Sequence, residues 1–342
     1  MNRSLLRLLL PFVVMLSLRM LIVEDSRAQT NVGTTVGQFL LIEPSARVAG
    51  MGNAGVTISD EAMGAFFNPA ALGRADRAQA QFGYSQWLAD INYNYVIATV
   101  PVGNGSFMVS MTSLESGEID VRTVAQPLGT GERYTVSDVA YGVGYGMKVT
   151  DRVSAGIQVK FMQETIWHSS ISAFAMDVGT LFKLSEDGLV IGASLSNFGT
   201  RARYDGRDLR VRYDFDPKLF GDNSSLPAQL YTDEFGLPIL FRVGLQYSLQ
   251  FGDNHRIVLV ADAFHPNDNT ESVSVGGEYT FAGTLSLRAG YQNLWQQDSE
   301  VGLTLGAGVG YDLFGADFQL DYGWTDFSRL GAVQRLTLGL LF

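Results

Sequence analysis

Three glycines near the front of the chain have the spacing of a dinucleotide-binding loop. Gly50, Gly52 and Gly55 match the pattern G-x-G-x-x-G. Such a loop cradles a pyrophosphate only where it joins a strand to a helix in a βαβ unit. Only Arg47-Val48-Ala49 precedes Gly50, and no parallel α/β unit follows. The spacing therefore favours close backbone packing over nucleotide binding, and we expect no cofactor.

The histidines are the other residues that could do chemistry. The chain has three, His168, His255 and His265, and no cysteine, which excludes disulfides and thiolate metal sites. A surface lipase would need a serine and a histidine on adjacent strands with a partner acid. His168, followed by Ser169 and Ser170, is the one local candidate, but adjacency in sequence is not catalytic geometry. We predict no catalytic residues, no metal site and no enzymatic activity, and keep a surface lipase as a remote alternative.

Composition points to a membrane-embedded β-barrel. Charged residues make up 17% of the chain, aromatic residues 11%, and there are 38 glycines. This combination is unusual for a soluble domain and typical of a barrel with a lipid-facing outer surface. The net charge of −11 argues against nucleic-acid binding. No segment after the first 28 residues has 18 consecutive apolar residues, so only a closed barrel could span the membrane.

Residues 1–28 have the features of a secretory signal peptide. Arg3 and Arg7 precede an apolar core over 8–18, and Ser26-Arg27-Ala28 offers a small-x-small cleavage site. The alternative, a membrane anchor, is disfavoured because the apolar run is too short to span a bilayer.

From Ala78 onward, apolar and polar or small residues alternate. In 139–149, Val139, Tyr141 and Val143 share one face, while Ala140 and Gly142 share the other. This alternation is expected when one face meets lipid and the other the lumen. We predict an all-β fold, a 14-stranded antiparallel transmembrane β-barrel. Its strands lie near 78–87, 91–102, 106–115, 137–149, 153–166, 170–184, 188–197, 239–251, 255–264, 271–282, 284–293, 302–312, 316–325 and 333–342.

The connections alternate in length. Those after even-numbered strands are short, such as Gly103-Asn104-Gly105, whereas most of those after odd-numbered strands are longer. The connection around His168 is a short exception. Bacterial outer-membrane barrels have tight periplasmic turns and longer outer loops. We therefore expect a multi-pass barrel in the bacterial outer membrane with both termini in the periplasm.

The final strand continues to the last residue. Leu336, Leu338, Leu340 and Phe342 alternate with other residues to the end of the chain. A terminal aromatic residue on such a strand is similar to the assembly signal of outer-membrane barrels, which implies the barrel assembly machinery as a partner. Pairing of this strand with the first would remove both sheet edges.

Two segments do not fit the strand pattern. Residues 29–77, which include the glycine-rich stretch 44–73, are expected to form a hatch inside a barrel of residues 78–342. Asn68 would cap a one-turn helix that begins at Pro69 and ends at Gly73. Near 198–238, a large outer loop mixes arginines and aspartates with aromatic residues. It predicts either a folded cap that faces proteins or lipopolysaccharide, or a solvated loop.

Charged residues are also expected on the lumen face of the strands. They would either form interior ion pairs that anchor the hatch, which we favour, or line a selective pore. These residues are Lys148, Lys160, Asp177, Arg242, Asp262, Glu278, Arg288, Asp317, Asp321 and Arg335.

The stretch 44–73 closely resembles the N-terminal signature of the PorV/PorQ family of outer-membrane proteins. Ser45 stands where that family has glycine. The resemblance rests on Ser45-Ala46-Arg47, Gly50-Met51-Gly52, Ala54, Asp60-Glu61-Ala62, Asn68-Pro69-Ala70 and Leu72. Within it, the hatch motif would comprise Arg47, Gly50, Met51, Gly52, Asp60, Asn68, Pro69 and Ala70. The family is in turn similar to FadL-type barrels, which implies 14 strands and an N-terminal hatch.

The resemblance implies a role in type IX protein secretion or surface attachment. The partners would be type IX secretion substrates and attachment-complex proteins, besides outer-membrane lipid and lipopolysaccharide. The alternative is a FadL-like channel for uptake of hydrophobic small molecules, with a ligand pocket around Phe66, Phe67 and Leu72.

Overall fold

The computed structural model describes residues 32–184, 188–216, 218, 225–296, 299–313 and 315–342. The expected signal peptide and the first three residues of the expected hatch lie outside this range. The predicted all-β fold is confirmed, because the chain forms a closed 14-stranded antiparallel barrel. Its strands are β1 (Gln79–Gln86), β2 (Asn92–Val102), β3 (Gly105–Asp120), β4 (Arg133–Lys148), β5 (Val153–Ile166), β6 (Ser169–Lys183), β7 (Leu189–Gly199), β11 (Leu240–Phe251), β12 (His255–Pro266), β13 (Ser272–Phe281), β14 (Leu285–Leu294), β15 (Leu303–Leu313), β16 (Ala316–Asp326) and β17 (Ala332–Leu341).

Pairing of the first and last strands closes the ring. β1 pairs with β17 from Gln79↔Leu341 to Gln86↔Gln334. The other strands pair with their neighbours in sequence, except that β7 pairs with β11 across the long insertion. Closure leaves no strand edge unpaired within the ring. Among the described residues, no helix has the length and apolar character needed to cross a membrane.

Apolar side chains cover the outer face of the barrel. In β4, Tyr141 and Val143 are exposed while Gly142 and Gly144 are buried. The same alternation appears in β16, where Phe318 and Leu320 are exposed and Asp321 is buried. The sequence pattern thus corresponds to an apolar outside and a small or polar inside, as a barrel in lipid requires.

The two ends of the barrel differ. One end, which we call the turn end, carries tight turns such as the one at Gly103-Asn104 between β2 and β3. The other, the loop end, carries the longer connections, including 121–132 between β3 and β4. The turn at Trp167-His168 between β5 and β6 is the short exception at the loop end. β3 and β4 extend beyond their predicted ends on this side, to Asp120 and from Arg133.

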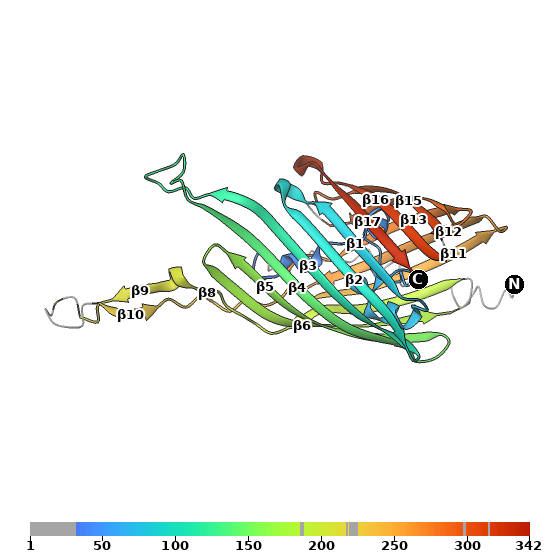
Figure 1. Cartoon of the computed structure of the whole chain (residues 1–342), viewed down its shortest axis with the longest axis horizontal. Coiled ribbons are helices and arrows are strands. Elements are labelled where there is room, and N and C mark those ends of the chain that lie inside the picture. Colours follow the sequence, from blue (N-terminus) through green and yellow to red (C-terminus); the bar gives the residue numbers. More distant parts are fainter. Residues whose placement is uncertain (1–31, 185–187, 217, 219–224, 297–298, 314) are drawn as a thin grey trace, which may run out of the picture. The chain divides into compact units, whose positions relative to one another are not determined.

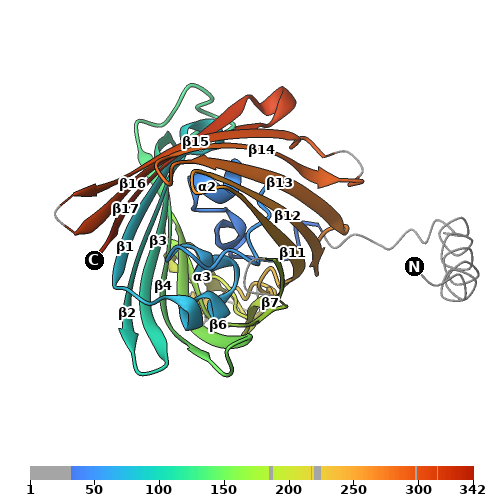
Figure 2. The same ribbon diagram turned by 90° about the vertical axis from the view of Figure 1, so that its right-hand side faces the viewer.

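The segment before β1 lies inside the ring, where Figure 2 shows α2 and α3 surrounded by strands. We call residues 32–77 the hatch segment. It contains short elements only, η1 (Gln38–Leu41), α2 (Ala46–Ala49), α3 (Gly64–Phe67) and η2 (Pro69–Arg74). The Asn68 side chain accepts a hydrogen bond from the Ala70 amide and caps η2, as its sequence predicts. Ser45 caps α2 in the same way.

The long insertion between β7 and β11 is partly folded. It holds β8 (Asp205–Gly206), η4 (Arg207–Leu209), β9 (Arg210–Tyr213) and β10 (Leu226–Gln229). β8 pairs with β6, whereas β9 and β10 form a separate hairpin that projects beyond the ring in Figure 1. The end of the insertion returns to the hatch segment, because the Val36 amide donates to the Gly236 carbonyl.

Candidate functional site

A buried ion network joins the hatch segment to the barrel wall. Arg47 makes a bidentate pair with Glu278 of β13, with both N–O distances at 2.8 Å, and also binds Asp60. Arg288 of β14 extends the network, donating to Glu278 and to Asp321 of β16 at 2.6 Å each. A second pair, Arg335 with Glu43, lies elsewhere on the wall. These charges neutralise one another, and two of the pairs fix the hatch segment to strands.

The network shifts the pKa values of the neighbouring acids Asp60 and Glu61 in opposite directions. Burial alone would raise the pKa of Asp60, but the adjacent Arg47 guanidinium holds that pKa well below its usual range. Burial raises the pKa of Glu61 to about 7, and Arg47, at 3.5 Å, only partly opposes this. Glu61 accepts a hydrogen bond from the Ser45 hydroxyl at 2.9 Å. Its carboxyl is therefore readily protonated in the folded chain.

The glycine string of the hatch segment lies against glycines of the wall. A Cβ atom on Gly276 of β13 would come within 2.2 Å of the Met51 carbonyl oxygen. One on Gly290 of β14 would come within 2.4 Å of the Gly52 amide nitrogen. Gly52 itself has a φ of 71° and faces the Val275 and Tyr291 carbonyls. The backbones meet with no room for side chains or a nucleotide.

Asn68 connects the hatch segment to the opposite part of the ring. Its Nδ2 donates to the carbonyls of Val56 and of Thr180 in β6. The Pro69 carbonyl that follows lies against Gly146 and Gly156 of β4 and β5. Met51 and Ala70 are fully buried in these contacts. The hatch motif residues thus contact the wall or one another.

Phe66, Phe67 and Leu72 lie in packed clusters. Phe66 stacks edge-on with Phe67 and with Tyr95 of β2, at centroid distances of 5.1 and 5.6 Å. Phe67 and Leu72 are buried. None of the three lines the cavities described below. Their assignment to a ligand pocket stays a prediction.

A cavity of about 410 Å³ lies between the hatch segment and the loop-end half of β11–β14. Arg242 reaches it from β11 and is almost fully buried. Its one side-chain hydrogen bond within the described chain goes to the Ser196 hydroxyl at 3.2 Å, and the rings of Phe67 and Phe264 lie 5.8 and 5.9 Å away. We call this the Arg242 cavity.

A groove of about 370 Å³ lies on the outward face of the same strands. It is lined mainly by apolar residues, including Phe241, Val273 and Trp295. Phe264 and Ser272 line both this groove and the Arg242 cavity. They form the last residue pair of the β12–β13 ladder, and the next ladder, β13–β14, shifts register between Val273 and Val275.

An apolar groove of about 750 Å³ lies at the loop end of the barrel. Three connections contribute aromatic side chains to it: Tyr134 at the start of β4, Trp167 between β5 and β6, and Tyr204 in the insertion. Tyr134 and Trp167 lie 6.0 Å apart, and Ile119 and Leu209 complete the apolar walls. We call this the loop-end groove.

Comparison with known proteins assigns the chain to a family. A family model described as type IX secretion system protein PorV matches residues 25–208, more than half of the chain. The chain belongs to the PorV family. No curated protein sequence matches it.

Solved structures confirm the FadL-type barrel of this PorV-family chain. The toluene transporter TodX of Pseudomonas putida superposes with a TM-score of 0.56 at 12% identity, over 88% of this chain and 98% of TodX. The Ralstonia pickettii toluene transporter TbuX gives 0.54 at 11% identity, over 87% and 97%. CymD, a monoaromatic hydrocarbon channel, gives 0.54 at 11% identity, over 88% and 97%. At these identities the likeness is one of fold.

The surroundings of His168 in this PorV-family barrel do not form a catalytic triad. His168 Nδ1 lies 2.9 Å from Asp208, and its Nε2 lies 2.7 Å from an Arg207 nitrogen, where a nucleophilic serine would have to be. His255 contacts the Tyr279 hydroxyl and His265 contacts Glu271. Within the described residues, no group of three metal-ligating side chains comes together.

The C-terminal residues lie on the barrel wall. Leu338 and Phe342 are exposed on the apolar face, Leu340 is half-buried, and the Phe342 amide donates to the Ala78 carbonyl. Their role as an assembly signal stays a prediction. Sequence reasoning missed the Arg242 cavity and the loop-end groove, because each is assembled from separate segments that carry no common motif.

Proposed function

We propose that this PorV-family barrel takes part in type IX protein secretion or surface attachment. It would act without enzymatic activity, binding exported substrates or attachment partners at the loop end. In this proposal the turn end and both termini face the periplasm, residues 1–28 are the signal peptide, and residues 29–77 are the hatch.

The observation that carries the proposal is the extent of the family match. Residues 25–208 include the hatch segment, β1–β7 and most of the loop-end groove, from Ile119 to Asp208. The groove would supply the binding surface, because exposed apolar patches rimmed by polar groups are typical of protein interaction sites. Further exposed apolar side chains lie on the same end, including Val124, Leu128, Phe215 and Tyr231.

The hatch segment supports binding over free conduction. Its backbone lies directly against the wall on opposite sides of the ring, at Gly276 and at Gly156. The lumen charges are largely used in ion pairs rather than left open to a pore. These contacts would keep the barrel rigid, and the loops would bind the partner proteins.

Site-specific photocrosslinking in the native bacterium tests the proposal. A photoreactive amino acid at Trp167 should capture secreted proteins or attachment components, whereas the same amino acid at Asn104, on the opposite end, should not. Deleting the gene should reduce the amount of these proteins on the cell surface. Normal surface display in the deletion strain, or equal capture from both positions, would contradict the proposal.

The Arg242 cavity favours a second candidate, an uptake channel for hydrophobic small molecules. The cavity and the outward-facing groove share Phe264 and Ser272, so they adjoin at this pair of β12–β13. Structural neighbours with the same fold include toluene transporters. Replacing Ser272 with tryptophan should block this route and reduce uptake of a labelled hydrocarbon. Equal uptake by cells with and without the gene would rule out this candidate.

A further inference from the structure

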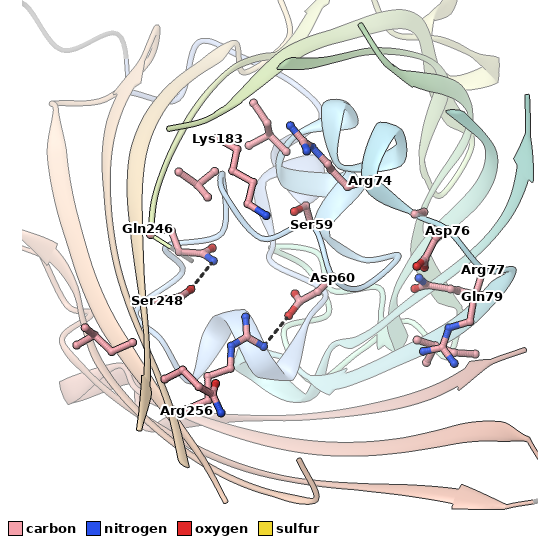
Figure 3. A pocket seen from close by; sticks show the side chains of 17 residues that line it. Ser59, Asp60, Arg74, Asp76, Arg77, Gln79, Lys183, Gln246, Ser248 and Arg256 are labelled. Atoms are coloured by element: carbon pink, nitrogen blue, oxygen red, sulfur yellow. Dashed lines mark hydrogen bonds and ion pairs between the residues drawn. The ribbon is translucent and has the colours of Figure 1, made fainter. Parts of the chain in front are cut away.

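A polar cavity of about 580 Å³ opens at the turn end of the barrel. We call it the turn-end vestibule. The hatch segment forms one side of it, through Ser59, Asp60 and the stretch from Arg74 to Arg77, and the turn-end halves of β6, β7, β11 and β12 form the other. Figure 3 shows these side chains around the open space. The vestibule lies at the opposite end of the barrel from the loop-end groove.

The basic side chains of the vestibule differ in how they are neutralised. Arg77 pairs with Asp317 at 2.7 Å, and Arg256 lies 3.6 Å from Asp60. Arg74 is held by two backbone carbonyls and the Ser154 hydroxyl, with no carboxylate contact. Lys183 makes no side-chain hydrogen bond or ion pair with any described residue.

The Lys183 ammonium faces the interior of the vestibule. In Figure 3 the Lys183 amine, the Ser59 hydroxyl and the Gln246 amide point into the same space. Gln246 makes only a long contact of 3.4 Å with Ser248. The vestibule is lined by four basic side chains, Arg74, Arg77, Lys183 and Arg256, against two carboxylates, Asp60 and Asp76. Among the described residues its lining is therefore net positive. Anionic groups, such as carboxylates, form strong charge-assisted hydrogen bonds with donors of this kind.

The vestibule continues into a second cavity of about 270 Å³, because Asp60, Gln250 and Arg256 line both. In the second cavity the buried charges are already paired, as Arg47 and Arg288 bind Glu278. Two adjoining cavities of this size exceed what a compact ion needs and have room for an extended chain segment.

We propose that the turn-end vestibule binds an acidic extended segment of a partner protein. One carboxylate of the segment pairs with Lys183, and neighbouring acidic groups reach Arg74 and Arg256. The chain as a whole carries a net charge of −11, so the basic lining of the vestibule is a local departure from the overall charge that favours an acidic ligand. This inference does not rest on the proposed role of the loop-end groove. It adds a binding site at the other end of the barrel.

A labelled acidic peptide tests the inference on the purified full chain in detergent. Fluorescein-labelled hexaglutamate should bind saturably, with an affinity that falls as salt concentration rises. The variant Lys183→Gln should weaken binding by about tenfold, as expected for loss of one charge-assisted contact. Lys148→Gln is the matched control. Lys148 is another turn-end lysine, exposed and outside the vestibule, and its loss should leave binding unchanged.

Competition identifies the kind of ligand. Unlabelled hexaglutamate should displace the probe, whereas inorganic phosphate at equal charge should not. Displacement of the labelled peptide by inorganic phosphate would show that the site binds small anions and would overturn the peptide assignment. Absence of saturable binding, or equal weakening by Lys148→Gln, would also overturn it. Both lysines reach the surface of the barrel, so neither variant is expected to alter folding, and unchanged unfolding curves would establish this.

Discussion

At the scale of single residues, Arg47 is one of the side chains that join the hatch segment to the wall. Its guanidinium pairs with the buried Glu278 and with Asp60, whose side chain is 45% exposed. Arg47→Ala would remove the bidentate partner of Glu278, leaving it only Arg288, and would leave Asp60 without its guanidinium hydrogen bonds. Removing one partner of a buried pair costs about 3–5 kcal/mol. We expect a loss of that order in the free energy of unfolding, measured by urea titration in detergent micelles.

Arg133→Ala provides the control for Arg47. Arg133 forms an ion pair with Glu118 in which both side chains are more than half exposed. Exposed pairs of this kind contribute about 0–1 kcal/mol. Comparable losses in the two variants would show that the Arg47 network does not hold the hatch segment.

Glu61 gives the hatch segment a predicted pH dependence. Its pKa is raised to about 7 in the folded chain from 4.5. The contribution of this raised pKa to the free energy of unfolding is therefore fully present below pH 4.5 and is lost as the pH rises through 7. The shift corresponds to a change on the order of 3 kcal/mol. We expect unfolding free energies of the wild type to fall over this range, measured by denaturant titration at each pH.

Glu61→Gln isolates this effect, because the amide cannot lose a proton and still accepts a hydrogen bond from Ser45. The unfolding free energy of the variant should exceed that of the wild type by a growing margin as the pH rises from 4.5 to 7. Parallel profiles of the unfolding free energy against pH would show that the pKa of Glu61 is the same in the folded and the unfolded chain.

At the scale of elements, β13 shows how a strand seats the hatch segment. Gly276 faces the lumen, where a Cβ atom would meet the Met51 carbonyl at 2.2 Å, and Gly277 faces outward, where the nearest atom is a leucine methyl at 3.3 Å. Overpacking costs about 1–3 kcal/mol. Gly276→Ala should speed proteolysis of residues 44–73 in the folded barrel. Gly277→Ala changes the neighbouring residue of the same strand and should leave the rate of proteolysis unchanged. Equal cleavage of both variants would contradict the packing of residues 44–73 against Gly276.

Elements with a two-residue period were predictable because lipid and lumen impose opposite chemistry on the two faces of every strand. β5, for example, was predicted over the residues that it occupies, Val153–Ile166. The cap at Asn68 was predictable because capping is local. The hairpin β9–β10 was not, since its strands have only four residues each and β10 contains a proline.

The candidate sites were less predictable than the fold. Tyr134, Trp167 and Tyr204 meet in the loop-end groove from three connections, and Lys183 faces Ser59 across the vestibule from distant parts of the chain. No spacing in the sequence links such residues, because loops and barrel closure set their distances. The hatch motif could be found in the sequence because all its residues fall within one stretch.

At the scale of the whole molecule, the last strand must close the ring, and we expect its terminal residue to matter for assembly. Phe342 is exposed on the apolar face beyond the end of β17. Deleting it should lower the amount of heat-modifiable barrel in the outer membrane, while the purified variant should still refold in detergent. Replacing the exposed Leu330 with alanine, in the β16–β17 connection, is the control. Normal membrane levels of the deletion variant would contradict an assembly role.

The orientation of the barrel decides which partners can reach each site. If the loop end faces outward, Leu128 in the β3–β4 connection is outside the cell and Asn104 in the β2–β3 turn is in the periplasm, and both are exposed. The chain has no cysteine, so Leu128→Cys and Asn104→Cys each introduce a unique thiol. A maleimide polymer too large for porins should label Leu128→Cys on intact cells. It should label Asn104→Cys only after the outer membrane is permeabilised.

The opposite labelling pattern would reverse the proposed orientation. The loop-end groove would then face the periplasm and could not receive proteins at the cell surface, and the vestibule around Lys183 would face outward. Binding of an acidic peptide to the purified chain would be unaffected by that result. The labelling experiment therefore tests the sidedness on which the surface role depends, while the two sites themselves are tested by crosslinking and by peptide binding.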